Sequence, residues 1–227
     1  MPEPRRGRAH DAEGAREAIL NAAEEVFAEH GFDGARIAVI AAVANYNSSL
    51  IFQYFDDKLG LYAAVLKHAD KEMSELQMRV FAPLLENATI ASNVQQFKAL
   101  LETVVQTLFD YLIEHPRFMR MMLWEMAEGW QTYAQLSSQL QTEDVDQFEL
   151  FFRKAQSAGL LRSGFIPVIQ LAMALQVCQS YLAFLPLYQM LLPGEDVSSP
   201  AAFARAREYV VDFVVAGLMV SPGETKQ

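Results

Sequence analysis

The stretch from Ser163 to Gly194 contains no Asp, Glu, Lys, Arg or His, and this absence limits what the chain can fold into. Such a stretch either crosses a membrane, for which roughly 20 apolar residues suffice, or is buried within protein. Its polar residues and one proline argue against a membrane span: Gln170, Gln176, Gln179, Ser180, Pro186 and Gln189. We therefore expect no membrane partner, and a helix at 165–192 that is buried in a helical bundle or across a subunit contact.

The rest of the chain also shows helical spacing, and no segment alternates apolar and polar residues as a strand would. Only 11 glycines and 9 prolines occur in 227 residues, which favours long helices over short strands and turns. Gly31 is placed to end the first helix in a left-handed conformation. The sequence predicts an all-α protein of about nine helices, at 15–30, 37–44, 48–54, 58–81, 94–114, 118–130, 143–158, 165–192 and 200–220.

Charge and composition exclude several classes of function. The net charge of −10 argues against a protein that coats nucleic acid regardless of sequence, because phosphate neutralisation requires Lys and Arg. The single cysteine, Cys178, excludes an internal disulfide and a cysteine metal site, and is typical of a reducing compartment. No apolar run follows the N-terminal arginines, the four histidines are far apart, and no enzyme motif is present. We therefore expect a cytoplasmic protein that is not an enzyme, with no catalytic residue, metal or cofactor.

Two short helices joined by a tight turn follow the first helix, as in a helix-turn-helix motif at about 36–55. Asn45 tolerates the positive φ that such a turn requires, and Asn47 can cap the second short helix. The dipeptide Ser48-Ser49 is small enough for that helix to enter a major groove. Ile51 and Phe55, four residues apart, are expected to point into the core.

Three local patterns suggest a family. They are the Ile-Leu-x-Ala-Ala run at 19–23, the Phe-x-x-x-Gly-Phe helix stop at 27–32 and the Tyr-Phe-x-x-Lys sequence at 54–58. With them, residues 13–73 resemble the DNA-binding domain of the TetR/AcrR transcriptional regulators. The resemblance implies a three-helix DNA-binding domain over 13–73, joined through a long fourth helix to a C-terminal ligand-binding and dimerisation domain over 74–221.

The resemblance also implies partners and contact residues. The partners would be double-stranded operator DNA, a second copy bound through about 165–192 and 200–220, and an unidentified small-molecule effector. The expected DNA contacts are Arg36, Tyr46, Asn47, Ser48, Ser49, Phe52, Gln53, Tyr54 and Lys58. Residues 1–12 form an arm, expected to be flexible, whose arginines are either solvated or enter a minor groove. Residues 222–227 are expected to form a flexible tail.

The DNA-binding segment departs from the usual pattern of the family. Asn45-Tyr46-Asn47 replaces a Gly-Val-Ser turn, Ala35-Arg36 replaces a threonine pair, and Phe52 replaces a tyrosine. Residues 1–58 hold six basic and ten acidic residues. Non-specific affinity for DNA should therefore be weak, and specific binding should depend on where the arginines lie.

A second candidate site lies in the C-terminal region, where Phe118, Met122, Glu125 and Met126 share one helical face. Such side chains line ligand sites as well as cores, so both interpretations stay open. The Glu125 carboxylate requires a partner, and we favour an arginine (Arg117, Arg120 or Arg153) over a polar ligand. The candidate ligand-binding residues are Phe118, Met122, Glu125, Met126, Phe152, Gln176 and Tyr181.

Together these patterns predict a homodimeric, ligand-responsive repressor that binds a palindromic operator. The alternative is a helical dimeric small-molecule sensor or scaffold that has lost operator binding. The acidic N-terminal segment and the unusual turn would favour this alternative.

Overall fold

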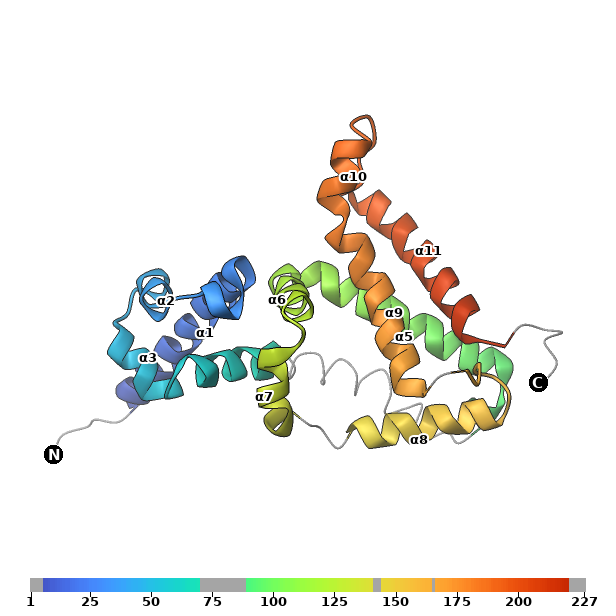
Figure 1. The fold of residues 1–227 in the computed structure, drawn as a ribbon, viewed down its shortest axis with the longest axis horizontal. Coiled ribbons are helices and arrows are strands. Elements are labelled where there is room, and N and C mark those ends of the chain that lie inside the picture. The colour runs from blue at the N-terminus through green and yellow to red at the C-terminus, as the bar shows by residue number, and fades with distance from the viewer. Residues whose placement is uncertain (1–5, 70–88, 141–143, 165, 221–227) are drawn as a thin grey trace. The chain divides into compact units, whose positions relative to one another are not determined.

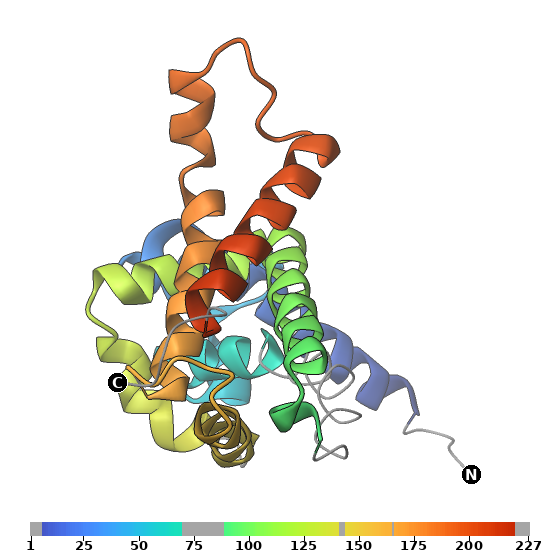
Figure 2. The same ribbon diagram turned by 90° about the vertical axis from the view of Figure 1, so that its right-hand side faces the viewer.

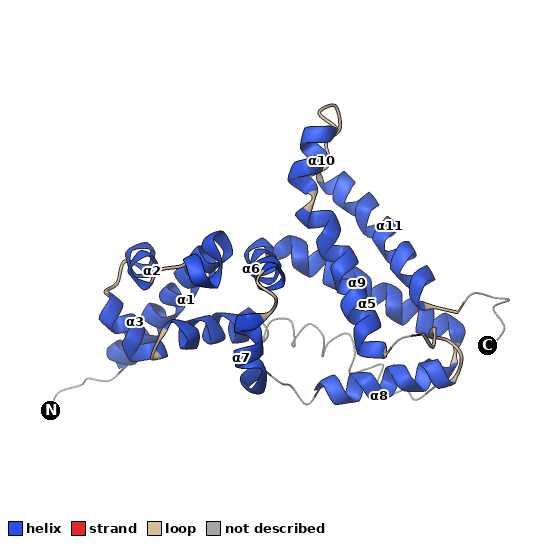
Figure 3. Ribbon diagram, in the orientation of Figure 1, coloured by secondary structure: helices blue, strands red, loops and turns tan. Residues whose placement is uncertain are grey.

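The computed structural model describes residues 6–69, 89–140, 144–164 and 166–220, with backbone alone for 6–11, 137–140 and 144–148. Within these ranges every regular element is a helix, in agreement with the predicted all-α fold (Figures 1 and 3). The helix predicted at 58–81 is described from residue 58 to residue 69. Its remainder, the first five residues of the predicted arm and the predicted tail lie outside the described residues.

The predicted helices occur in the predicted order, with differences at their ends; in addition, no helix is predicted at Gln131–Leu140, and the helix predicted at 165–192 is divided into two. They are α1 (Arg6–Gly34), α2 (Ile37–Ala44), α3 (Ser48–Phe55), a helical segment at 58–69, the 3-10 turn η1 (Ile90–Ser92), α5 (Val94–Glu114), α6 (Pro116–Ala127), α7 (Gln131–Leu140), α8 (Asp144–Ser157), α9 (Pro167–Ala183), α10 (Leu185–Leu191) and α11 (Pro200–Leu218). The bounds predicted for α2 and α5 are confirmed. Helix α1 begins at Arg6 rather than Ala15, so part of the predicted arm is helical, because its alanines favour a helix.

The chain forms two compact units, one from residues 1–74 and 115–141 and the other from 75–114 and 142–227. One C-terminal domain is predicted over 74–221. In the structure, α6 and α7 pack with the N-terminal helices instead. The physical reason is apolar burial, since Met121 and Met122 of α6 and Leu136 of α7 belong to the N-terminal core. A local pattern predicts α6 but not the unit that it joins, and α7 is not among the predicted helices.

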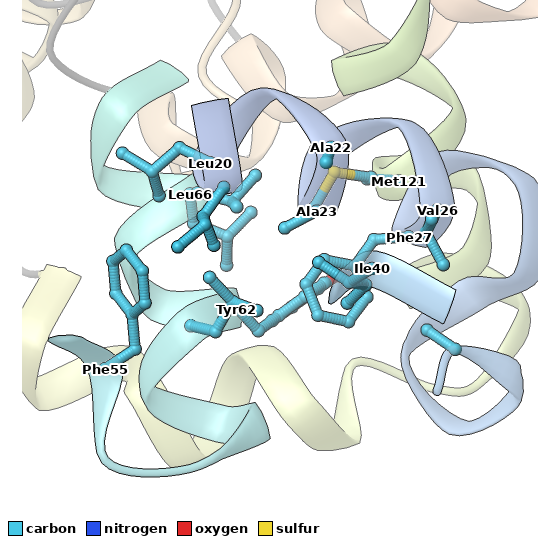
Figure 4. Packing of buried hydrophobic residues seen from close by; sticks show 14 of the residues in the cluster. Leu20, Ala22, Ala23, Val26, Phe27, Ile40, Phe55, Tyr62, Leu66 and Met121 are labelled. Atoms are coloured by element: carbon cyan, nitrogen blue, oxygen red, sulfur yellow. The ribbon is translucent and has the colours of Figure 1, made fainter. Parts of the chain in front are cut away.

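The core of the first unit lies between α1, α2, α3 and the helical segment at 58–69. Ile19, Phe27, Ile40 and Ile51 are fully buried, as their helical spacing predicts. The ring of Tyr62 meets Phe27 edge-on, with 4.8 Å between ring centroids. Figure 4 shows side chains of this core, among them Phe27, Ile40 and Tyr62, converging from separate helices. Burial of side chains of this size contributes roughly 1.5–3 kcal/mol each, so this core holds the helix-turn-helix in place.

The second unit is built on α5, which packs against α9 and α11. Phe97 and Phe109 of α5 are fully buried, and Phe152 of α8 meets Phe97 at 6.1 Å between ring centroids. Arg207 of α11 forms an ion pair with Asp110 of α5 at 2.7 Å. The predicted cap of α11 is confirmed, since the Ser199 hydroxyl accepts a hydrogen bond from the backbone N–H of Ala202 at 3.3 Å.

Helices α9 and α10 replace the single helix predicted at 165–192 (Figure 2). The two are bent by 45° at Phe184. Pro186 lies in the first turn of α10, and in a continuous helix its ring would clash with the carbonyl of Leu182. Among the described residues no single helix is long and apolar enough to span a membrane, although the bent pair meets that criterion by length and composition.

The helix predicted at 118–130 ends earlier, at Ala127 of α6, and α7 follows at Gln131–Leu140, where no helix is predicted. Gly129 and Trp130 have φ values of 73° and 62° between the two helices. The backbone N–H of Trp130 donates to the Glu125 carbonyl at 2.7 Å, and that of Gly129 donates to Met126. These bonds satisfy the last carbonyls of α6, as in a left-handed helix end.

Candidate nucleic-acid interface

The turn between α2 and α3 has the geometry that the sequence predicts. Asn45 adopts the left-handed conformation, with φ 58° and ψ 39°, and its backbone N–H donates to the Ala42 carbonyl at 3.2 Å. The N–H of Tyr46 donates to Ala41 at 3.0 Å. Asparagine therefore makes the turn in which a glycine is usual, because it tolerates a positive φ.

Helix α3 is capped by a side chain and anchored by two others. The Asn47 carboxamide oxygen accepts a hydrogen bond from the backbone N–H of Leu50 at 2.8 Å, so the predicted cap is confirmed. Ile51 and Phe55 are buried, as predicted. The guanidinium of Arg16 on α1 lies over the Phe55 ring, 5.4 Å from its centroid. These contacts fix which face of α3 is exposed.

The exposed face of α3 carries Ser49, Phe52 and Gln53, which follow one another at helical spacing. The Phe52 side chain is 47% exposed, and Tyr46 in the turn is 40% exposed. Residues 37–55 include no charged side chain at all. This surface can therefore contact a partner only through hydroxyl, amide and aromatic groups.

Two acidic residues of α1 interact with other groups of the first unit. Glu25 pairs with Arg117 of α6 at 2.8 Å, and Glu17 lies 3.6 Å from a ring nitrogen of His68. The net negative charge of residues 1–58 therefore lies on α1 and around the ends of the motif, outside residues 37–55.

Two predicted contact residues of α3 are directed partly toward the first unit itself. The Tyr54 hydroxyl donates to the backbone carbonyl of Ala12 on α1 at 3.2 Å, and the Tyr54 ring meets Phe55 edge-on. Ser48 is half-buried at the start of α3. For both residues DNA contact stays a prediction, and for Tyr54 a structural role stands beside it.

Two basic residues flank the uncharged motif. Arg36 is exposed immediately before α2, where its backbone carbonyl accepts bonds from the first turn. Lys58, the first residue of the helical segment at 58–69, donates from Nζ to the Asp33 carbonyl at 3.3 Å, and its Nζ lies 4.6 Å from the centroid of the Phe32 ring. The ammonium group of Lys58 is thus held on the turn that precedes α2, a contact that sequence reasoning missed.

Helix α1 is kinked at Gly31, which begins the turn before α2, and this turn is in contact with α6 through Gly31. Gly31 has φ 68° and ψ 179°, so its φ is positive as predicted but its ψ is extended rather than left-handed helical. A β-carbon there would lie 3.1 Å from both the Trp124 ring and a Glu128 carboxylate oxygen. The Trp124 indole N–H donates to the Ala28 carbonyl at 3.2 Å. Sequence reasoning missed this contact of Trp124, which is 37% exposed.

The predicted arginine partner of Glu125 is wrong. Glu125 is 1% exposed, and its two oxygens accept bonds from the Tyr62 hydroxyl at 2.8 Å and from the Tyr133 backbone N–H at 3.0 Å. Arg117 pairs instead with Glu25, and Arg153 with its own-helix neighbour Glu149. A carboxylate accepts as readily from neutral donors as from arginine, and packing of α6 brought two such donors within reach.

Burial and the carboxylate of Glu125 raise the pKa values of two neighbouring side chains, Tyr62 and Glu128. Burial, followed by the hydrogen bond and the charge of Glu125, raises the pKa of Tyr62 well above its usual value. Partial burial, then repulsion from Asp33 and Glu125, raises the pKa of the Glu128 carboxyl, and Lys58 partly offsets this. Electrostatic interactions therefore connect Glu128, at the end of α6, with Asp33 in the turn before α2 and with Lys58.

The candidate ligand residues do not form one cluster. Phe118, Met122, Glu125 and Met126 belong to the first unit, where Phe118 and Met122 pack on its core. The others belong to the second unit, where Phe152 is buried, Gln176 is exposed, and the Tyr181 hydroxyl donates to the Val197 carbonyl at 3.3 Å.

The second unit contains an open groove of about 1140 Å³ that sequence reasoning missed. It is formed by the end of α8, the loop at 158–164, α9 and α11, and none of the seven candidate ligand residues lines it. Its polar lining includes Gln156, Arg162 and Gln170. The side-chain amides of Gln156 and Gln170 both donate hydrogen bonds to the Arg162 backbone carbonyl. No group of three or more His, Cys, Asp or Glu side chains that could hold a metal occurs in the described part of the chain.

Comparison with known proteins gives matches along most of the chain. Residues 19–65 match the model of the bacterial regulatory proteins of the tetR family. Residues 98–214 match the model of the tetracyclin repressor-like C-terminal domain. The two matched segments include α2, α3 and most of the second unit.

Individual relatives agree with these matches. The chain is 27% identical over 178 residues to the HTH-type transcriptional repressor NicS of Pseudomonas putida, covering 77% of this chain and 78% of NicS. It is 35% identical over 120 residues to the HTH-type transcriptional repressor SCO4008 of Streptomyces coelicolor, covering 53% and 54%. The crystal structure of SCO4942, a transcriptional regulator of S. coelicolor, superposes with a TM-score of 0.60 at 25% identity, covering 90% of this chain and 98% of that one.

Proposed function

Because the chain belongs to the TetR family of bacterial transcriptional regulators, we propose that it is a homodimeric repressor that binds a palindromic operator and is released by a small-molecule effector. It acts in the cytoplasm, where operator DNA is present, and it carries out no catalysis. The contacts of each subunit with DNA come from Arg36, Lys58 and the exposed face of α3.

The observation that carries this proposal is the geometry of α2, the Asn45 turn and α3. A capped helix anchored on its inner face presents small polar and aromatic side chains outward, as a major-groove helix requires. Two such helices, one per subunit, would contact half-sites about one helical turn, ~34–36 Å, apart. A palindromic operator follows from the two-fold symmetry of the dimer.

The dimer would form through α9 and α11. Their exposed faces carry large apolar side chains, at Ile169 and Met173 on α9 and at Tyr209 and Phe213 on α11. Tyr209 and Phe213 stack on each other, with 6.4 Å between ring centroids. An exposed apolar surface of this kind is typical of a protein interface.

We expect sedimentation in dilute buffer to give a dimer, and Phe213→Glu to shift the protein toward the monomer. A glutamate there would place an unpaired charge in the interface, which is strongly unfavourable. Leu150→Glu is the matched control, because Leu150 is more exposed than Phe213 and lies on α8. A wild-type monomer would argue against the proposed function as a whole.

The effector would bind in the second unit, which holds Phe152, Gln176 and Tyr181. Met122 and Glu125 are buried in the first unit, so we assign this part of α6 to holding that unit together. Coupling between effector and operator is typically about 1–3 kcal/mol and is reciprocal. Operator DNA must therefore weaken effector binding by the same factor as effector weakens DNA binding.

Lys58→Ala should make operator binding less dependent on salt. Each lost phosphate contact lowers the slope of log K against log salt concentration by roughly 0.9, and a dimer would lose two such contacts. The measurement is a titration of operator binding at several salt concentrations. Lys67→Ala, an exposed lysine on the same helical segment, serves as control and should leave the slope unchanged. An unaltered slope in Lys58→Ala would remove Lys58 from the interface.

Selection of genomic fragments with the purified protein tests the proposal. We expect enrichment of a palindromic sequence, and the neighbouring genes would suggest the effector. Failure to enrich any sequence would instead support a dimeric sensor without operator binding. The excess of acidic over basic residues in positions 1–58 favours that alternative.

A further inference from the structure

We infer that the centre of each operator half-site consists of A·T pairs, with Gln53 bound to adenine and Phe52 and Tyr46 in contact with thymine methyl groups. The inference rests on the proposed function and adds to it the base composition that α3 recognises. It follows from two observations on residues 37–55: they expose Tyr46, Phe52 and Gln53, and they contain neither arginine nor lysine.

The first step concerns guanine. The commonest specific contact to a G·C pair in the major groove is a bidentate bond from Arg or Lys to guanine O6 and N7. Residues 37–55 contain neither arginine nor lysine. Arg36 precedes α2 rather than α3, and Lys58 is held by the Asp33 carbonyl and the Phe32 ring. The exposed face of α3 therefore lacks the groups that bind guanine best.

The second step concerns adenine. Asn and Gln bind adenine N6 and N7 through both atoms of their carboxamide. Asn47 and Gln53 are the exposed carboxamides of α3 and its cap, but the Asn47 oxygen accepts the capping bond from Leu50 at 2.8 Å. That bond fixes the orientation of the Asn47 side chain. Gln53, exposed on the outward face beside Ser49, is the carboxamide placed to bind adenine.

The third step concerns thymine. Phe52, within α3, is 47% exposed, and Tyr46, in the turn before α3, is 40% exposed. Among the major-groove edges of the bases, thymine carries a methyl group, which aromatic side chains contact favourably. Placing these rings against thymine methyl groups would remove exposed apolar surface from water. A half-site rich in guanine and cytosine would leave the rings without apolar partners.

Base analogues test the inference on the operator obtained by selection. In one set of duplexes, deoxyuridine replaces thymidine in the half-site centres and removes only the methyl group. In another, 7-deazaadenine removes the adenine N7 acceptor. We expect each lost methyl contact to weaken wild-type binding roughly fourfold, and the loss of an adenine contact to weaken it about 5- to 150-fold.

Variants assign each effect to a side chain. Phe52→Ala should abolish the penalty of uracil substitution at one position, and Gln53→Ala should abolish the penalty of 7-deazaadenine. Val43→Ala is the matched control, since Val43 is also 47% exposed but lies on α2; it should keep both penalties. The analogues leave the protein unchanged, so the test does not depend on how well a variant folds.

The possible outcomes separate the inference from the function on which it rests. A selected palindrome with G·C pairs at the centre of each half-site would overturn the inference and leave the proposed function intact. So would analogue penalties that persist unchanged in Phe52→Ala and Gln53→Ala. If no palindrome is selected, the proposed function itself fails, and the inference fails with it.

Discussion

Gly31→Ala should lower the free energy of unfolding by roughly 2–6 kcal/mol. The Gly31 backbone, with φ 68° and ψ 179°, is in a region open essentially to glycine alone, which costs other residues about 1–3 kcal/mol. The added β-carbon would also lie 3.1 Å from the Trp124 ring, and crowding of this kind costs about 1–3 kcal/mol. Chemical denaturation at fixed protein concentration measures the difference.

Gly14→Ala is the control for that substitution. Gly14 also lies in α1, and nothing approaches the position of an added β-carbon there within 4 Å. Alanine in a helix is favoured over glycine by about 0.5–1 kcal/mol, so this variant should be neutral or more stable. Equal stability of Gly31→Ala and wild type would show that the turn before α2 does not depend on this glycine.

Glu125→Ala should lower the free energy of unfolding by about 3–5 kcal/mol. The change leaves the Tyr62 hydroxyl and the Tyr133 N–H without their acceptor, and each buried donor left unpaired costs about 1–3 kcal/mol. The cavity left by the side chain adds to this loss. Because α6 packs on α1 through this region, operator binding should fail at temperatures where the variant unfolds.

Glu128→Ala is the matched control, one helical turn away at the end of α6. Glu128 is half-buried, and its raised pKa reflects this burial and repulsion from Asp33 and Glu125. Its ionised carboxylate therefore contributes no stability through these neighbours, and its removal should be neutral or slightly stabilising at neutral pH. A loss below about 1 kcal/mol in Glu125→Ala would contradict the structural role of Glu125.

The helix-turn-helix was predictable because its signals are local. Asn45 makes a positive-φ turn, Asn47 accepts a bond from a residue three positions later, and Ile51 and Phe55 share one face of a single helix. Each of these depends on neighbours within a few residues. The same is true of the Ser199 cap of α11.

The remaining features depend on contacts between distant parts of the chain. The partners of Glu125 are one residue 63 positions away and a backbone group beyond the end of its own helix. Spacing along α6 indicates a buried face but not whether the N-terminal helices or α5 would cover it. The hydrogen bond from Lys58 to the Asp33 carbonyl likewise depends on how the turn at Gly31 folds, which no local pattern specifies.

The central claim is that the uncharged exposed face of α3 reads the operator sequence. Its most direct test is the ratio of the dissociation constants for a scrambled duplex and for the operator, in wild type and in Gln53→Ala. We expect the ratio to fall about 5- to 150-fold in the variant, with unchanged affinity for scrambled DNA and an unchanged dimer. The same ratio in both proteins would contradict the claim.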